Sequence, residues 1–161
     1  MTIRKAVLSD KNQILAIYEH AREQMRKSGN PNQWGTNHPP VDVIEYDIKN
    51  GNSYVIVEKD EIYGVFVFVI GTEPTYERIE DGRWLNDALY GTVHRVASSG
   101  KQKGIVRYCL SFCETKISNI RIDTHACNYI MRHLLENSGY QRCGIIYVAD
   151  GSPRIAYQKT I

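Results

Sequence analysis

The stretch with the clearest chemical potential covers residues 94–106, where a predicted strand ends and a helix begins. The first turn of a helix exposes unpaired backbone N–H groups and a positive partial charge, which favour an anionic ligand. Gly100 and Gly104 have no side chain to keep a phosphate from the backbone, and Lys101 and Lys103 add positive charge. The stretch predicts a phosphate-binding turn. The alternative is an amphipathic helix with a solvated, basic first turn.

Two common phosphate-binding motifs are excluded by the spacing. A P-loop ending at Gly100 and Lys101 needs a glycine at position 95 and Ser or Thr at position 102, where this chain has Arg95 and Gln102. A G-x-G-x-x-G dinucleotide-binding sequence is absent as well. The turn therefore predicts a different phosphate-bearing ligand.

The turn resembles that of the GNAT superfamily of N-acetyltransferases. In that family, Gln/Arg-x-x-Gly-x-Gly/Ala follows the fourth strand and binds the pyrophosphate of coenzyme A. Here Lys101 stands at the Gln/Arg position, Gly104 matches the glycine, and Val106 stands at the Gly/Ala position. The resemblance implies that the donor is acetyl-CoA and that relatives stabilise its oxyanion with a backbone N–H of the fourth strand. It assigns coenzyme A binding to Val96, Ala97, Ser98, Lys101, Gln102, Lys103, Gly104, Ile105, Val106 and Asn128.

A second stretch resembles the family run Asn-x-x-Ala-x-x-Leu-Tyr-x-x-x-Gly-Phe. The family's asparagine often contacts the pantetheine arm, and its tyrosine often protonates the leaving thiolate. Leu135 stands at that tyrosine position and cannot transfer a proton. Another group or water must therefore do so. The matching positions are Asn128, Met131, Leu134, Gly139 and Tyr140.

Acetyl transfer to an amine requires a neutral amine, and hence a base or a proton path. Asp123 and His125 lie at the end of one predicted strand, and His94 precedes the expected carbonyl site on its neighbour. Polar groups meet a bound ligand where such strands end. We therefore select Asp123, His125 and His94 as catalytic candidates. In the alternative, Asp123 pairs with Arg95 and His125 caps the following helix.

Two irregular segments, which form the acceptor side in this family, hold the candidate substrate-binding residues. Trp34 lies in the first segment, and Tyr76, Glu77 and Trp84 lie in the second, with Glu80 beside them. Carboxylates there would suit a cationic amine. They could also be solvated only, and Trp34 could instead pack the first two helices together.

Hydrophobic periodicity predicts an α/β (α+β) fold in the order β-α-α-β-β-β-α-β-α-β-β. Asp10 is expected to cap the first helix. The β-α-β stretch from Leu89 to Thr124 requires a parallel pair, and the last two strands form an antiparallel hairpin. With the resemblance, we expect a mostly antiparallel mixed sheet with a central parallel pair and helices on both faces. The predicted strands are Ile3–Val7, Tyr54–Val57, Ile62–Ile70, Leu89–Ala97, Asn119–Thr124, Tyr140–Val148 and Arg154–Thr160.

The length of 161 residues suits one domain, so residues 1–161 are expected to form a single acetyltransferase domain. The net charge of +2, from 20 basic and 18 acidic residues, gives no reason to expect a nucleic-acid partner. The longest apolar run, Val65–Ile70, is too short for a membrane span, and no signal-peptide core is seen. We expect a cytoplasmic protein.

Cysteine and histidine spacing argues against disulfides and metals. No CxxC pair occurs, and the four cysteines are expected to be reduced thiols. His125, Cys127 and His133 lack a further ligand at matching spacing, so no metal site is expected.

Together these features predict an acetyl-CoA-dependent N-acetyltransferase, a transferase of the acyltransferase class. Its acceptor is expected to be a small-molecule amine or an amino-acid-like amine, and a homodimer is possible. Two alternatives stay open, namely a protein N-terminal or lysine acetyltransferase and a non-catalytic acyl-CoA-binding regulatory domain.

Overall fold

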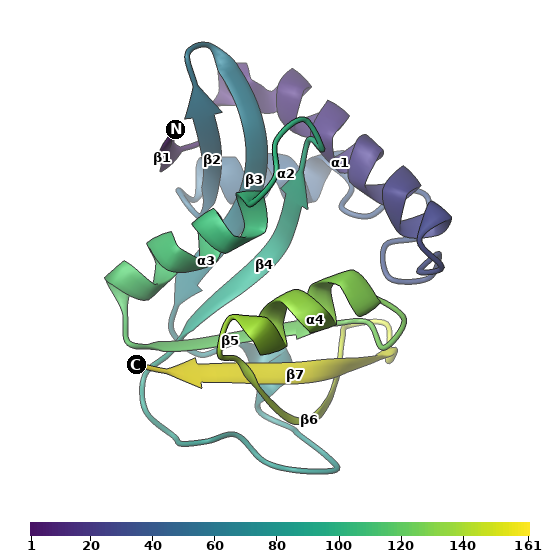
Figure 1. The fold of residues 1–161 in the computed structure, drawn as a ribbon, viewed down its shortest axis with the longest axis vertical. Helices are drawn as coiled ribbons and strands as arrows, with labels where there is room; N and C mark the ends of the chain where they lie inside the picture. Colours follow the sequence, from purple (N-terminus) through teal and green to yellow (C-terminus); the bar gives the residue numbers. More distant parts are fainter.

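The computed structural model describes all of residues 1–161 (Figure 1). The helical elements are α1 (Lys11–Lys27), α2 (Val41–Lys49), α3 (Ile105–Lys116) and α4 (Tyr129–Asn137), with short 3-10 turns at Leu8–Asp10 and Pro74–Tyr76. The strands are β1 (Thr2–Lys5), β2 (Ser53–Glu58), β3 (Glu61–Ile70), β4 (Gly91–Ser98), β5 (Asn119–Thr124), β6 (Gln141–Tyr147) and β7 (Pro153–Thr160). The predicted order of elements is confirmed.

The seven strands form one sheet in the order β1-β2-β3-β4-β5-β7-β6. Every neighbouring pair is antiparallel except β4 and β5, which are parallel. The predicted central parallel pair and the terminal hairpin are therefore confirmed.

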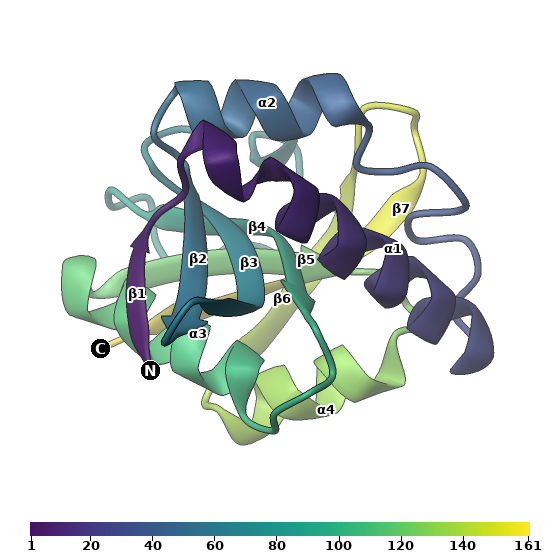
Figure 2. The same cartoon turned by 90° about the horizontal axis from the view of Figure 1, so that it is seen from above.

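Helices cover both faces of the sheet, as Figure 2 shows, with α1 and α2 on one side and α3 and α4 on the other. The α1 and α2 side has a core that contains Ile14, Tyr18 and Ile44. The opposite core contains Cys109 and Leu110 of α3 and Leu135 of α4. Burial of these apolar faces is what drives amphipathic helices onto a sheet.

The parallel pair separates soon after it forms. Only Gly91 and Thr92 of β4 pair with β5, opposite Ile120 and Arg121, and the two strands then diverge (Figure 1). The register of β4 against β3 also shifts near Arg95, whose φ of 46° lies in the left-handed region. A bulge of this kind bends a strand and re-aims its side chains. The result is an opening between β4 and β5 at the centre of the sheet.

Two local expectations differ from the structure. The β4 strand begins at Gly91 rather than Leu89. Asp10 precedes α1, but its side chain does not cap that helix. Its carboxylate instead accepts from the Val7 N–H and from both terminal nitrogens of Arg4, at 2.7 and 3.0 Å. The charged partner within reach competes successfully for the carboxylate.

None of the helices is long and apolar enough to cross a lipid bilayer.

Candidate functional site

Two adjoining cavities open where β4 and β5 separate. The smaller has a volume of about 220 Å³ and an apolar lining, and we call it the apolar cavity. The larger has a volume of about 550 Å³ and contains most of the charged groups, and we call it the polar cavity. Four residues line both cavities, so the two spaces meet at the bulge of β4: Met25, Val96, Asn128 and Met131.

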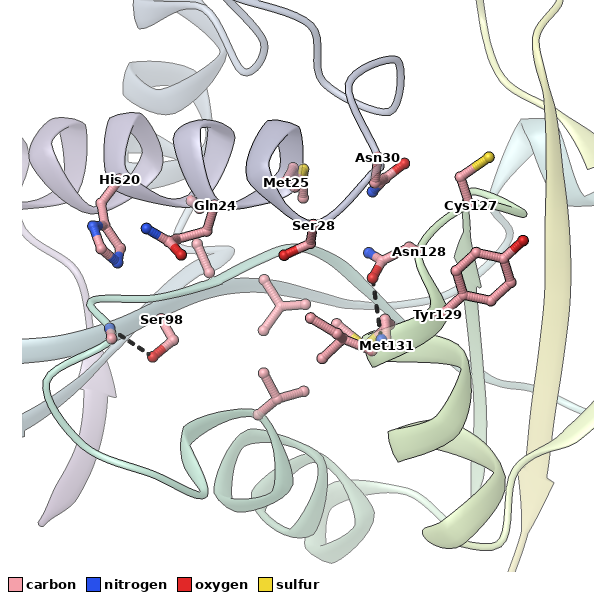
Figure 3. Close-up of a pocket in the computed structure, with 16 residues that line it drawn as sticks. His20, Gln24, Met25, Ser28, Asn30, Ser98, Cys127, Asn128, Tyr129 and Met131 are labelled. Carbon is pink, nitrogen blue, oxygen red and sulfur yellow. Dashed lines mark hydrogen bonds between the residues drawn. The ribbon is translucent and has the colours of Figure 1, made fainter.

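The apolar cavity lies between the second half of α1, the end of β4 and the first turns of α3 and α4 (Figure 3). Its lining includes the predicted residues Val96, Ala97, Ser98, Val106 and Asn128. Sequence reasoning missed the contribution of α1, where His20, Ala21, Gln24 and Met25 form the opposite wall.

The turn between β4 and α3 leaves a row of backbone donors free. Side-chain oxygens of Ser98 and Ser99 accept from the N–H groups of Gly100 and Lys101, at 3.1 and 3.3 Å. The next six N–H groups, residues 102–107, have no hydrogen-bond partner, because the first bond of α3 runs from Tyr108 to Gly104. Such a run of donors at a helix N-terminus suits a phosphate.

The two glycines of this turn have different roles. Gly104 has a φ of +81°, and an added Cβ would meet nothing within 4 Å, so the space beside it is open. At Gly100, with a φ of +78°, an added Cβ would lie 2.6 Å from Nε2 of His20. Gly100 therefore admits a histidine of α1, whereas Gly104 leaves open space next to the free donors.

Four other predicted coenzyme A residues surround these donors. The Lys101 ammonium lies 3.2 Å from Glu61, and both side chains are exposed. Gln102 and Lys103 are exposed, and the Ile105 side chain is buried in the core beneath α3. Only the backbone of Ile105 is therefore open to a ligand.

Asn128 sits at the N-cap of α4 and at the junction of the cavities. Its Oδ1 accepts from the Met131 N–H at 3.1 Å, as Figure 3 shows, and its Nδ2 donates to Oε1 of Gln33 at 2.9 Å. The same Gln33 oxygen accepts from Asn30 and lies 3.4 Å from the Thr124 hydroxyl. This network ties the segment after α1 to the end of β5.

His94 lines the polar cavity, and its Nε2 lies 3.6 Å from Oε1 of Glu73. Burial lowers the pKa of His94 to about 4, with a smaller contribution from the Arg95 charge. His94 is therefore a neutral imidazole at pH 7, able to accept a proton.

Asp123 also lines the polar cavity, and its Oδ2 accepts from the Tyr76 hydroxyl at 2.6 Å. Burial raises the pKa of this carboxyl, against the lowering effects of the Tyr76 hydrogen bond and the Arg154 charge. The ion pair between Asp123 and Arg95, which was the alternative to a chemical role for Asp123, does not form. Arg95 instead binds Asp47 of α2 with two hydrogen bonds of 2.8 Å, and its carbonyl accepts from the Tyr18 hydroxyl.

His125 lines neither cavity, although Thr124 and Cys127 beside it do. Its Nδ1 accepts from the Cys127 N–H at 3.0 Å, in the turn that leads into α4. Burial lowers its pKa, and the Arg154 charge adds to this effect. Leu135, at the position of the family tyrosine, has no exposed surface and packs in the core on the α3 side. Neither residue faces the cavities.

The predicted acceptor residues differ in whether they line the polar cavity. Trp34 lines the polar cavity, and its ring also packs on Tyr18 of α1, at 5.6 Å between centroids. Tyr76 does not line the cavity, but its hydroxyl donates to Asp123 and its ring lies 6.3 Å from that of His94 between centroids. The indole N–H of Trp84 donates to the Tyr76 carbonyl. Neither Trp84 nor Glu77 lines a cavity.

Sequence reasoning missed Glu73 and Arg154 of this cavity, and also Asp47, which lies outside the lining but binds Arg95. Glu73 lies in the segment after β3, directly before the proline that starts the 3-10 turn. Asp47 could have been noticed as a carboxylate between the buried Ile44 and Ile48 on α2, a position that demands a partner. Arg154 could have been noticed as a charge at the start of an apolar strand.

Arg154 of β7 is 7% exposed and lines the polar cavity. Its terminal nitrogens donate to the carbonyls of Pro153 and Gln33, at 2.8 and 3.0 Å. No carboxylate forms an ion pair with it. Burial lowers the pKa of its guanidinium, while Asp123 and Asp150 act in the opposite direction.

The two cavities thus offer different chemistry at one junction. One side presents apolar walls and free backbone donors, which suit a long ligand with a phosphate group. The other presents two imidazoles, three carboxyl groups and two guanidinium groups, which suit a polar molecule that must lose a proton. No group of three or more His, Cys, Asp or Glu side chains is arranged to hold a metal ion.

Comparison with known proteins identifies structural relatives. No protein-family model and no curated protein sequence matches the chain. The fold matches a GNAT-family acetyltransferase from Streptococcus agalactiae with a TM-score of 0.90 and 33% identity, covering 99% of this chain and 95% of that one. It also matches a putative acetyltransferase from Staphylococcus aureus, with a TM-score of 0.70, 25% identity and 99% coverage of both chains. A third match, from a NatC complex bound to Gag peptide and CoA, has a TM-score of 0.64 and 13% identity over 99% and 98% of the two chains, and it supports the fold alone.

With a third of its residues identical to the streptococcal protein over nearly the full length of both, this chain belongs to the GNAT family of acetyltransferases, enzymes that use acetyl-CoA as the donor.

Proposed function

We propose that residues 1–161 form one acetyltransferase domain that transfers the acetyl group of acetyl-CoA directly to the amine of a small-molecule or amino-acid-like acceptor. The observation that carries this proposal is the meeting of two chemically different cavities at Val96, on the β4 bulge. Direct transfer needs both reactants at one place, and adjoining cavities with a common wall satisfy that need.

The apolar cavity and the 98–107 turn are the proposed donor site. The free N–H groups of residues 102–107 fit a pyrophosphate, and the open space beside Gly104 lets it approach the backbone. Acetyl-CoA supplies the acetyl group as a thioester. The apolar cavity, whose lining reaches Val96, suits the pantetheine arm, and Asn128 offers a polar contact where the two cavities meet.

The polar cavity is the proposed acceptor site. In it, Glu73 and Asp123 attract a protonated amine, which releases one proton to water before it reacts. The neutral nitrogen then bonds to the acetyl carbon and becomes strongly acidic, and the neutral His94 accepts its second proton. The carbon–sulfur bond breaks as this tetrahedral intermediate collapses. Leu135 is buried, and a leucine side chain has no proton to donate. The leaving thiolate therefore takes its proton from water or from the protonated His94.

The setting is proposed to be the cytoplasm, as expected from the sequence. All four cysteines are free thiols in the fold, and Cys109, Cys113 and Cys143 are buried. This agrees with a reducing compartment.

The experiment that tests the function measures release of coenzyme A thiol from acetyl-CoA in the presence of single amines. Calorimetry with coenzyme A runs in parallel. The proposal expects binding of coenzyme A and amine-dependent thiol release, with an N-acetylated product of the expected mass. Binding without amine-dependent release from any small amine would contradict it and favour a protein acceptor.

A further inference from the structure

Two arginines are almost fully buried in this protein, and they differ in how their charge is balanced. Arg121 of β5 and Arg154 of β7 are 5% and 7% exposed. The Arg121 guanidinium lies over the rings of Trp84 and Tyr90, at 4.2 and 3.9 Å from their centroids. Two aromatic faces balance much of the cost of burying that cation.

Arg154 has neither an aromatic ring nor a carboxylate in contact with it. Its two hydrogen bonds go to the neutral carbonyls of Pro153 and Gln33, so three of its five N–H bonds have no protein partner. Burying a cation without a counter-charge in contact is unfavourable, and an anionic ligand at this place would supply the missing charge. The side chain lines the polar cavity, so an anion placed there can reach it.

The position of Arg154 relative to the carboxylates is set by the sheet. Asp123 of β5 pairs in register with Ala156 of β7, and Arg154 is two residues before Ala156. Residues two apart on a strand share a face, so Arg154 and Asp123 are diagonal neighbours on the same face. Toward β4, the cavity has a wall with Asp123, Glu73 and the neutral His94, and at β7 it has Arg154. Asp150, in the turn before β7, also lines the cavity and acts on the charge of Arg154 from a distance, but it forms no ion pair with it.

We propose that the acceptor carries a carboxylate as well as its amine, and that Arg154 binds this carboxylate. The inference rests on the proposed function, in which the polar cavity holds the acceptor. A guanidinium matches a carboxylate with two parallel hydrogen bonds, and the acidic groups opposite it would hold the amine toward Val96. The substrate class is then a free amino acid. A diamine would bring a second cation against Arg154.

The test compares free L-amino acids with their carboxamides, one compound at a time, by calorimetry in the presence of coenzyme A and by thiol release from acetyl-CoA. Each pair has the same side chain, and the carboxamide lacks the negative charge. Its amine also loses a proton more easily, so a preference for the acid cannot arise from amine acidity. We expect the best acid to bind and react at least about tenfold better than its carboxamide.

Arg154→Met and Arg154→Lys are compared with Arg121→Met and Arg121→Lys, which change an equally buried arginine outside the cavity. The Arg154 variants are expected to lose the preference for the acid, with Lys retaining part of it, while affinity for coenzyme A stays unchanged. The Arg121 variants are expected to keep the preference, even where stability falls. Because the readout is a ratio between two ligands, partial unfolding does not alter it.

The outcomes separate this inference from the proposed function. Selective binding of an acid without thiol release would support the Arg154 site and contradict the assigned reaction. Thiol release with carboxamides equal to their acids across the panel, or with the preference intact in Arg154→Met, would overturn the Arg154 site and leave the reaction standing. If no free amino acid binds and none is acetylated, the Arg154 site is overturned as well.

Discussion

The apolar and polar cavities meet at Val96, yet the chain builds them in different ways. The apolar cavity is lined by three segments: the second half of α1 with the residues after it, the end of β4 with the start of α3, and the start of α4. The polar cavity draws on the segment after α1, the segment after β3, the ends of β4 and β5, and the turn before β7 with Arg154. Both cavities are therefore assembled from distant segments, and the donor side adds one local motif that the acceptor side lacks, the turn between β4 and α3 with its free N–H groups.

The donor side and the acceptor side should therefore respond to different substitutions. Changes in the turn should alter affinity for coenzyme A and leave the acceptor side intact. Changes in the polar cavity should alter turnover and acceptor choice. The bulge at Arg95 belongs to both, because it sets the position of Val96 between them.

The largest effect is expected from Gly104→Glu. A carboxylate beside the free N–H groups would occupy and repel the pyrophosphate position, so affinity for coenzyme A should fall at least about 100-fold by calorimetry. Gly151→Glu is the matched control, because Gly151 has a similar φ of +85°, equally open surroundings, and itself lines neither cavity. Its neighbours Ala149 and Asp150 line the polar cavity, so the control is compared by affinity for coenzyme A alone. Both variants should lose comparable stability from backbone strain. Unchanged affinity in a folded Gly104→Glu protein would remove the turn from the donor site.

Asp47→Asn tests whether the bulge is held by its buried ion pair. The substitution leaves the Arg95 guanidinium without a carboxylate, and breaking a buried pair in this way costs about 3 kcal/mol of stability. Chemical denaturation measures the loss, and affinity for coenzyme A and turnover should both fall as Val96 shifts. Glu45→Gln, which breaks the exposed pair with Lys11 on the same helix, should cost less than about 1 kcal/mol. Equal losses in the two variants would contradict a special role for Asp47.

His94→Gln tests the acceptor side alone. If His94 accepts the amine proton, kcat/KM should fall on the order of 100-fold, with unchanged affinity for coenzyme A. In the wild type, log kcat/KM should lose its His94-dependent part only as pH falls toward about 4, not between 6 and 7. His125→Gln separates the two histidine candidates, and His133→Gln, on the exposed side of α4, is the control. A full loss in His125→Gln, with none in His94→Gln, would reverse the assignment.

The same histidine has a consequence for stability. Its pKa is about 4 in the fold and near 6.5 in an unfolded chain, so the unfolded state binds more protons between these values. The stability contributed by neutral His94 is therefore fully present above about pH 6.5 and is lost as pH falls toward 4. The melting temperature of His94→Gln should consequently depend less on pH across this range than that of the wild type.

Much of the fold was predictable from the sequence, because each element carries its own periodicity and end signals. The turn before α3 was predictable for the same reason, since its glycines and lysines are contiguous. The prediction could not recognise that Gly100 makes room for His20, because that contact joins α1 to a turn 80 residues away. Non-local contacts of this kind leave no trace in a periodic pattern.

The acceptor side was predicted less completely for a related reason. Tyr76 and Asp123 were chosen separately, and only the folded sheet shows that they bond to each other. The sequence suggested that Arg95 could pair with Asp123 across two neighbouring strands. In the structure, the bulge directs the Arg95 side chain to Asp47 of α2 instead. Arg154 was missed altogether, because an arginine at a strand start is common and its missing counter-charge is visible only in the assembled cavity.

The smallest effect is expected from the turn's lysines, and it decides whether charge or backbone dominates the donor side. Both side chains are exposed, and Lys101 already lies beside Glu61, so each contributes through screened, long-range attraction. The double variant Lys101→Ala and Lys103→Ala should weaken coenzyme A binding about threefold to tenfold at low salt and reduce its salt dependence. The matched control, Lys27→Ala with Lys49→Ala, removes the same charge from two lysines that line neither cavity. If both double variants weaken binding equally, only net charge matters. If neither does, the backbone donors of residues 102–107 bind the pyrophosphate alone, and the lysines are a solvated start to α3.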